Sequence, residues 1–212
     1  INYLEKNGEI IKIIKIIQNK GLGPALKLGI KHSKNNIIAR FDSDDINLKD
    51  RLEKQYKMIS SNKNISIIGS AIIEFEKFNR SDNYIIKKMP VNNSEIEKSY
   101  IYRNPLNHPT VMFRKSEIMK VGSYKNLKYF EDYELWIRCI KNNQIIVNHR
   151  KPLVAMKRKS YMANRKGFKY AFYEVIFLIE LIKSRNIGFI NIAFYILRII
   201  TRFLPKKLIE KL

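Results

Sequence analysis

The chain has 212 residues, of which 45% are hydrophobic, so it can bury a core and is not globally disordered. It carries 41 basic and 19 acidic side chains, a net charge of +22, which favours polyanionic partners: nucleic acid, an anionic membrane or phosphorylated ligands. Its single cysteine, Cys139, excludes an internal disulfide framework and is typical of a reducing compartment. No apolar run reaches the roughly 18 residues that a membrane-spanning helix needs.

Apolar residues recur at helix and strand spacings along the first 150 residues. The predicted helices cover residues 10–17 (whose end also fits a strand), 24–34, 48–59, 116–121 and 131–142, and the predicted strands cover residues 37–41, 65–73, 110–113 and 145–147. Asn47 and Ser116 are the expected caps of two of these helices. Residues 76–104 are predicted to form an irregular surface excursion. This alternation predicts an α/β fold with a largely parallel sheet, in which ligands bind at the carboxyl ends of the strands.

The end of the chain differs from the rest in charge density. Residues 151–212 hold 14 basic and 3 acidic side chains, the same net charge of +11 as residues 1–150 in less than half the length. We therefore place a boundary near Lys151 and Pro152, between a domain over residues 1–150 and a basic helical segment over residues 151–212.

Within that segment one narrow polar stripe recurs at helical spacing, and nearly everything else between residues 190 and 204 is apolar. The stripe consists of Asn191, Tyr195, Arg198 and Arg202. The pattern predicts a basic amphipathic helix that lies in a membrane interface. The alternative is a helix packed on the first domain or on another subunit.

Three carboxylates within four residues follow the strand predicted over residues 37–41, namely Asp42, Asp44 and Asp45. Like charges this close repel, so the cluster needs a cation or a capping role. A hard divalent cation suits it, because Mg²⁺ binds one or two carboxylates together with substrate phosphates. The alternative is a turn whose acids cap the following helix.

A second acidic cluster, Glu131, Asp132 and Glu134, begins the predicted helix over residues 131–142. Acids in a first turn favour the helix dipole, and a helix start can also present a general base. His108, in the segment Asn-His-Pro-Thr before a strand, either contacts a ligand or satisfies a backbone group.

In their order and spacing these motifs resemble those of glycosyltransferase family 2. The resemblance covers roughly residues 10–160 and rests on the run NKGLGPALKLGI…NNIIARFDSDDINLKDRLEKQ…ISIIGSAIIEF…RNPLNHPTVMFRKSEIMKVGSYKNLKYFEDYELWIR. It is similar in particular to the bacterial exopolysaccharide and capsule branch of the amylovoran-biosynthesis type.

The resemblance implies a GT-A fold and an inverting transfer of a sugar from a nucleotide-sugar, with Mg²⁺ or Mn²⁺ as cofactor. It assigns the metal to Asp42 and Asp44. The residues that it places on the donor side are Asp42, Asp44, Asp45, Arg40, Gly21 and Gly23.

The same resemblance implies that Asp132 is the general base and that Glu131 supports it. It places Asn107 and His108 on the acceptor side of the site. The implied chemistry is coherent, because a sugar hydroxyl is a poor nucleophile until a positioned carboxylate takes its proton.

The start of the chain departs from the family pattern. Family members open with a strand and a turn rich in Gly and Ser or Thr that carries an Asp contacting the nucleotide base, whereas this sequence starts at Ile1 with neither. We expect about the first βαβ portion to be missing, and this chain to bind nucleotide-sugar weakly or not at all.

Together these observations predict a peripheral glycosyltransferase on the cytoplasmic face of the inner or plasma membrane, acting in surface polysaccharide biosynthesis. Its expected partners are a UDP-sugar, a lipid-linked saccharide acceptor and an anionic membrane surface, without nucleic acid. The alternatives are a basic module that binds nucleic acid or membranes and an inactive glycosyltransferase fragment. Nucleic-acid binding would need basic residues interleaved with stacking aromatics, whereas the basic residues here are scattered.

Overall fold

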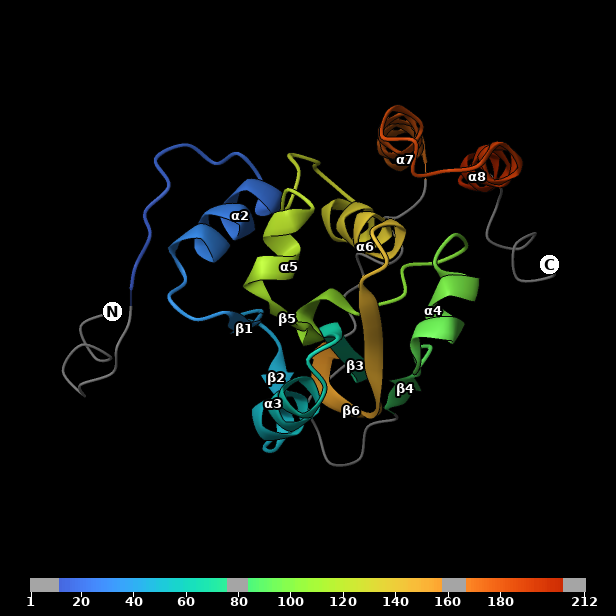
Figure 1. The fold of residues 1–212 in the computed structure, drawn as a ribbon. Helices are drawn as coiled ribbons and strands as arrows, with labels where there is room; N and C mark the ends of the chain where they lie inside the picture. The colour runs from blue at the N-terminus through green and yellow to red at the C-terminus, as the bar shows by residue number, and fades with distance from the viewer. Residues whose placement is uncertain (1–11, 76–83, 158–166, 204–212) are drawn as a thin grey trace.

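The computed structural model, which describes residues 12–75, 84–157 and 167–203, places one mixed sheet between layers of helices (Figure 1). Its helices are α2 (Leu22–His32), α3 (Arg51–Ser61), α4 (Asn93–Ser99), α5 (Lys115–Lys120), α6 (Glu131–Lys141), α7 (Phe168–Lys183) and α8 (Phe189–Thr201), with a 3-10 turn η1 (His108–Thr110). Its strands are β1 (Ile37–Ala39), β2 (Ile46–Asn47), β3 (Ile65–Phe75), β4 (Ile85–Lys87), β5 (Met112–Arg114) and β6 (Ile145–Lys157).

The described strands lie in the order β1-β5-β3-β6-β2, and β4 pairs with β3. Only β3 and β6 pair in parallel; the other four pairings are antiparallel. The prediction of a largely parallel sheet is therefore wrong for this part of the chain. The reason is that β5 lies between β1 and β3 and runs antiparallel to both. Strands β1, β3 and β6 therefore share a direction, but β1 is not a neighbour of β3.

This insertion of β5 decides where the functional motifs meet. Ala39 at the end of β1 lies opposite Met112 at the start of β5. The segment that leaves β1 and the segment that enters β5 therefore lie at the same edge of the sheet, although they are far apart in the sequence.

Each face of the sheet buries its own core. On one face α2, α5 and α6 pack against β3, β5 and β6, with Trp136 and Phe113 among the fully enclosed side chains. On the other face α3 covers the sheet, with Ile59 packed against Ile65 and Ile68. Figure 1 shows α3 on the side of the sheet opposite to α2, α5 and α6.

Several boundaries differ from those predicted. Asn47 does not cap a helix: it pairs in β2, and α3 begins only at Arg51 after Asp50. Ser116 lies inside α5, which begins one residue earlier. The first shift arises because pairing with β6 extends β2 to Asn47, and the second is a helix start displaced by one residue.

Two further predictions, an irregular excursion over residues 76–104 and a helix over residues 10–17, differ from the structure. The excursion over residues 76–104 contains β4 and α4 among its described residues, and the Asn92 side chain caps α4 by accepting a hydrogen bond from the Glu95 N–H at 2.9 Å. The helix predicted over residues 10–17 lies partly outside the described residues, and residues 12–17 are not helical. Among the described isoleucines of this segment, Ile13, Ile16 and Ile17 are exposed, so no regular apolar face is buried there.

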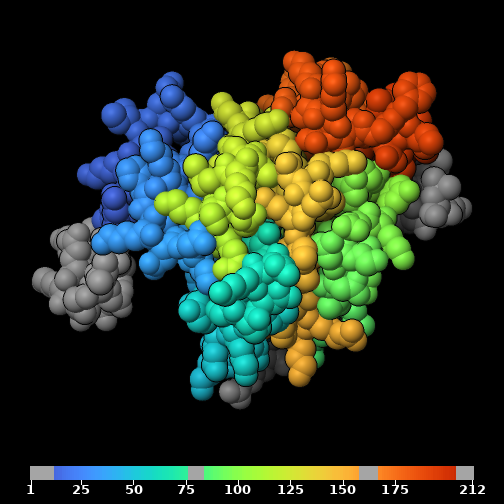
Figure 2. Space-filling model, viewed as in Figure 1, coloured from blue at the N-terminus to red at the C-terminus, as the bar shows by residue number. Residues whose placement is uncertain are grey.

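Strand β6 runs through Lys151 and Pro152, where the charge density suggested a boundary. Beyond it, α7 and α8 lie side by side and pack on α6 through Phe177, Tyr195 and Tyr133. Figure 2 shows both helices at one corner of the molecule, next to α6 and α4. None of the described helices is both long enough and apolar enough to cross a membrane.

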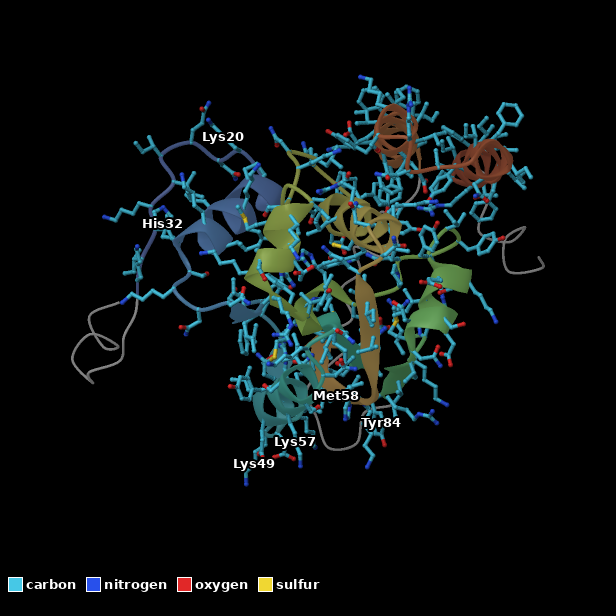
Figure 3. The ribbon with its side chains drawn as sticks, in the orientation of Figure 1. Lys20, His32, Lys49, Lys57, Met58 and Tyr84 are labelled. Carbon is cyan, nitrogen blue, oxygen red and sulfur yellow. The ribbon has the colours of Figure 1, made fainter. Side chains whose placement is uncertain are left out.

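Exposed basic side chains are spread over the molecule. Lys20 lies near the start of α2, whereas Lys49 and Lys57 project from the region of α3 at the other end (Figure 3). This spread differs from the single basic surface with stacked aromatics that nucleic-acid binding needs.

Candidate active site

The acidic cluster after β1 forms a tight turn at the edge of the sheet. The Asp45 N–H donates to the Asp42 carbonyl at 3.3 Å, and one carboxylate oxygen from each of Asp42, Asp44 and Asp45 lies within 4.8 Å of the other two. Such a set of oxygen ligands suits a hard cation such as Mg²⁺ or Mn²⁺. The structure thus brings together the two predicted metal ligands and their neighbour.

Arg40 binds this turn through its side chain and its backbone. Its guanidinium is buried and donates to Asp42 Oδ1 at 2.6 Å, while its backbone N–H donates to the Val111 carbonyl of the segment entering β5. Its Nε and Nη1 atoms find no hydrogen-bond acceptor within the described part of the chain. Buried N–H donors without acceptors are costly, so they suit an anionic ligand such as a diphosphate.

Arg51 holds the same turn from α3, a role that the sequence analysis missed. Its Nη2 donates to the Arg40 carbonyl at 2.7 Å, its Nη1 donates to Asn47, and its guanidinium stacks over Phe41. Burial, followed by the charge of Arg40, lowers the pKa of Arg51 to about 10. In the sequence Arg51 is one of many basic residues. The only feature that could have indicated its role is the cluster of acids that precedes it.

The second acidic cluster lies at the start of α6, where Phe130 adopts a left-handed backbone conformation before Glu131. Asp132 Oδ2 accepts a hydrogen bond from Asn104 Nδ2 at 2.7 Å and lies 3.9 Å from His108 Nδ1. The other ring nitrogen, His108 Nε2, lies 2.7 Å from the Tyr124 hydroxyl. His108 and Asp132 are thus brought together as the resemblance implies.

Asn104 and Tyr124 complete this arrangement and were not predicted. Asn104 lies four residues before His108 in the same loop, which is the signal that could have indicated it. Tyr124 follows a turn at Gly122, and its ring packs against those of His108 and Trp136. An aromatic residue in that setting is ordinary core material, so the sequence gives no hint of its hydrogen bond.

The protonation of the cluster is set by burial. Burial lowers the pKa of His108 to about 4, against a smaller opposite effect of Asp132, so the imidazole is neutral near pH 7. Burial and then the charge of Asp132 raise the pKa of Glu131 to about 7. A Glu131 that is partly neutral near pH 7 repels an ionised Asp132 less.

Arg40 connects the two acidic clusters. Besides its ion pair with Asp42, its charge lowers the pKa values of His108 and Glu131. The buried guanidinium of Arg40 therefore acts electrostatically on Asp42 in the first cluster and on Glu131 and His108 in the second.

The other predicted site residues are placed less directly. Gly23 lies against the site: a Cβ atom there would be 2.3 Å from the Lys125 carbonyl and 3.4 Å from Glu131 Cβ. Gly21 is exposed and has φ +97° at the N-cap of α2. Asn107 points away, because its buried side chain donates to the Ser70 carbonyl at 3.0 Å. The donor-side role of the glycines and the acceptor-side role of Asn107 stay predictions.

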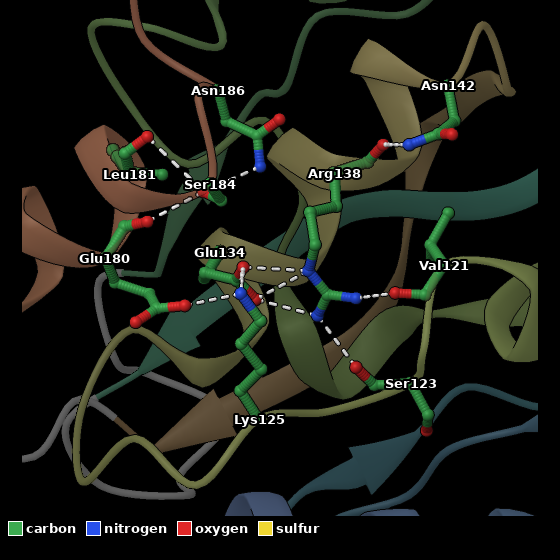
Figure 4. Close-up of polar contacts among 10 residues, drawn as sticks. All are labelled: Val121, Ser123, Lys125, Glu134, Arg138, Asn142, Glu180, Leu181, Ser184 and Asn186. Atoms are coloured by element: carbon green, nitrogen blue, oxygen red, sulfur yellow. Dashed lines mark hydrogen bonds and ion pairs between the residues drawn. The ribbon is translucent and has the colours of Figure 1, made fainter.

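A buried ion network supports the loop that leads into α6 (Figure 4). The Glu134 carboxylate accepts a hydrogen bond from Arg138 Nε at 2.7 Å, and the Arg138 guanidinium also donates to the carbonyls of Val121 and Ser123. Lys125 joins Glu134 to Glu180 of α7. The third acid of the second cluster is therefore structural, whereas Glu131 and Asp132 face the site.

Two similar bacterial proteins match nearly the whole chain. It is 33% identical to the amylovoran biosynthesis glycosyltransferase AmsE of Erwinia amylovora, over 93% of this chain and 74% of that protein. It is 38% identical to the UDP-Gal:alpha-D-GlcNAc-diphosphoundecaprenol beta-1,3-galactosyltransferase of Escherichia coli, over 92% of this chain and 71% of that protein.

Solved structures show the same fold at low sequence identity. S. aureus TarS 1-349 in complex with UDP-GlcNAc matches 85% of this chain with a TM-score of 0.56 and 17% identity. The mannosyltransferase PcManGT of Pyrobaculum calidifontis, in complex with GDP-Man and Mn²⁺, matches 88% with a TM-score of 0.59 and 10% identity. The chain spans about half the length of each, 53% and 50%. The predicted GT-A fold is confirmed.

The family model for glycosyl transferase family 2 matches residues 1–123, more than half of the chain and including the turn of Asp42 and Asp44. Together with the two relatives, this match confirms the resemblance that the motifs carry. This chain therefore belongs to glycosyltransferase family 2.

Proposed function

We propose that this chain transfers a sugar from a UDP-sugar to a hydroxyl group of a lipid-linked saccharide, in the synthesis of a surface polysaccharide such as a capsule. The observation that carries the proposal is the convergence of two acidic clusters, around Asp42 and Asp132, on one buried arginine at one edge of the sheet. Two related proteins support the substrate classes: one is named for UDP-Gal and a diphosphoundecaprenol acceptor, and another was solved with UDP-GlcNAc.

On the donor side, Asp42 and Asp44 would hold Mg²⁺ or Mn²⁺, with Asp45 beside them. The bound cation neutralises charge that develops on the leaving nucleoside diphosphate. Arg40 offers the diphosphate the two N–H donors that lack an acceptor in the described structure. The Mn²⁺ in the structure of the similar mannosyltransferase supports the choice of cation.

On the acceptor side, Asp132 takes the proton of the attacking hydroxyl. Its contacts with Asn104 and His108 both involve Oδ2, so we assign Oδ1 to the acceptor. As the hydroxyl oxygen bonds to the anomeric carbon, the bond from that carbon to the diphosphate breaks. One displacement of this kind inverts the configuration at the anomeric carbon. A neutral His108 fixes Asp132 without competing for the proton.

The enzyme works peripherally at the cytoplasmic face of the membrane under this proposal. An acceptor on a polyprenyl diphosphate, as named for the Escherichia coli relative, stays at the bilayer surface. The single buried cysteine suits the reducing side of that membrane.

The test separates the two halves of the site by substitution. Asp44→Asn should abolish Mn²⁺-dependent binding of UDP in calorimetry, because the substituted amide contributes no charge to the cation. Asp132→Asn should keep that binding but lower transfer by at least about 10²-fold, the scale of a general base.

Asp50→Asn is the matched control, since Asp50 is an exposed acid that forms an ion pair with Lys54 of α3. It should change neither UDP binding nor transfer. Unchanged UDP affinity in Asp44→Asn would contradict the donor site, and retained turnover in Asp132→Asn would reduce that acid to a helix-capping residue.

A further inference from the structure

Helix α8 turns its polar stripe inward. Tyr195 is fully buried, and Arg198 and Arg202 both pair with Glu174, a buried carboxylate of α7. Arg198 also stacks on the ring of Tyr195. The residues that the sequence suggested would meet solvent or headgroups therefore bind the protein itself.

The outward side of α8 is apolar as a consequence. Phe189 and Ile190 expose 90% and 85% of their surface, and the exposed residues continue along the same side of the helix. They are Phe189, Ile190, Ala193, Ile196, Leu197, Ile200 and, just past the helix, Phe203. The adjacent pairs at 189/190 and 196/197 make this face wider than the seam of a coiled coil.

Helix α7 repeats the arrangement. Its buried side carries Glu174 and Phe177, while five exposed residues at spacings of three and four are apolar; Lys169 and Lys183, near the two ends of the helix, are exposed as well. These residues are Phe168, Phe172, Val175, Ile179 and Ile182. An exposed apolar surface spread over two adjacent helices is larger than a monomeric protein in water ordinarily shows.

Charge favours a lipid surface over a second copy as the occupant of this face. Lys169, Lys183 and Arg185 are exposed around the two ends of α7, within a segment of net charge +11. Two copies joined through this face would bring these cations together, whereas anionic headgroups complement them. Both helices are also too short to cross a bilayer but suited to lying in its interface.

We infer that the outward faces of α7 and α8 insert into the interface of an anionic bilayer, so that this enzyme binds membranes through apolar side chains rather than through the polar stripe of α8. The inference deepens the proposed function and rests on it, because it places the bilayer against the helices packed on α6, whose first turn carries Asp132.

Vesicle flotation tests the inference with the full chain. The unsubstituted protein should float with vesicles of phosphatidylcholine and phosphatidylglycerol and remain partly bound at high salt. The double variant Phe189→Ser/Ile190→Ser should lower the bound fraction by at least about tenfold, because it removes two large inserted side chains.

Leu52→Ser/Tyr56→Ser is the matched control, since both residues are exposed apolar side chains of α3, on another side of the molecule. It should float like the unsubstituted protein, and circular dichroism should show both double variants folded. Equal flotation of the two double variants, or no flotation of the unsubstituted protein, would overturn the inference. So would a dimer in sedimentation that only Phe189→Ser/Ile190→Ser dissociates.

A transfer assay with a water-soluble acceptor separates this inference from the proposed function. Phe189→Ser/Ile190→Ser should retain turnover there, since neither residue touches the site. Turnover without vesicle binding refutes the membrane face alone. Vesicle binding without turnover refutes the transferase assignment and leaves the apolar contact with lipid standing.

Discussion

His108 illustrates how burial decides the state of a single group. Its imidazole is enclosed by Tyr124 and Trp136 and lies beside an acid, yet desolvation outweighs the attraction of Asp132 for a proton. The contact with Asp132 is therefore that of a neutral ring near pH 7. A lone histidine in a sequence suggests a ligand contact or a structural residue, and here one side chain both lies against Asp132 and fills the core.

The lowered pKa of His108 predicts a pH-dependent stability. Between pH 6.5, the ordinary value, and about 4, the unfolded chain binds a proton at this position and the folded chain does not. Stability therefore falls as the pH decreases through that window, by up to about 3 kcal/mol from this group. Glu131 has the opposite sign, because its raised pKa makes the folded state bind the extra proton between pH 4.5 and about 7.

A variant isolates the contribution of the histidine. In urea unfolding, His108→Gln should lose less stability than the unsubstituted protein when the pH is lowered from 6.5 to 4, since the effect of Glu131 is common to both. His149→Gln, a half-buried position away from the site, is the control and should follow the unsubstituted protein. Parallel pH profiles for all three proteins would show that His108 titrates normally.

At the scale of elements, the site depends on a close contact between α2 and the loop before α6. Gly23 has no room for a side chain because the Lys125 carbonyl lies where a Cβ atom would be. Gly29, in the same helix, has nothing within 4 Å of that position. The two glycines therefore form a matched pair.

Substituting alanine at each should have opposite effects on the free energy of unfolding. Gly23→Ala should lower it by about 1–3 kcal/mol and reduce transfer, because the loop carrying Glu131 must move. Gly29→Ala should raise it by about 0.5–1 kcal/mol through helix propensity and leave transfer unchanged. Urea unfolding and a transfer assay measure both. A Gly23→Ala protein of normal stability would mean that α2 does not press on that loop.

The elements themselves were largely predictable, and their pairing was not. The apolar patterns indicated α2, β3, α5 and α6, of which β3 and α6 are buried over most of their length. They could not show that β5 enters the sheet antiparallel, since direction depends on long-range connection rather than local pattern. The ordered motifs indicated Asp42, Asp44 and Asp132, whereas the only local signals for Arg51 and Asn104 are their positions close to the acids and to His108.

At the scale of the molecule, α8 belongs to the folded structure and not to a detachable tail. Removing residues 186–212 would leave Glu174 buried without Arg198 and Arg202 and would uncover Phe177. We expect the truncated chain to lose about 3–5 kcal/mol of stability, the usual cost of a buried charge left unpaired. Adding Glu174→Gln to the truncation should recover part of this loss.

Thermal and urea unfolding, followed by circular dichroism, measure both truncated proteins against the full chain. Equal stability of the full and truncated chains would show that α8 is an independent appendage. This prediction also explains why vesicle binding is better tested by surface substitutions than by deletion.

The position of β5 in the sheet has a consequence for the order in which the chain folds. The pairing of residues 37–39 with residues 112–114 closes a long loop, and such contacts form late because chain entropy opposes them until most of the structure is in place. Arg40 and His108 flank that pairing, so the turn of Asp42 and the contact of His108 with Asp132 come together only when the sheet is complete. A partly folded chain would therefore bind cation or nucleotide poorly, and the appearance of metal-dependent UDP binding during refolding would report the last step of assembly rather than the formation of any one helix or strand.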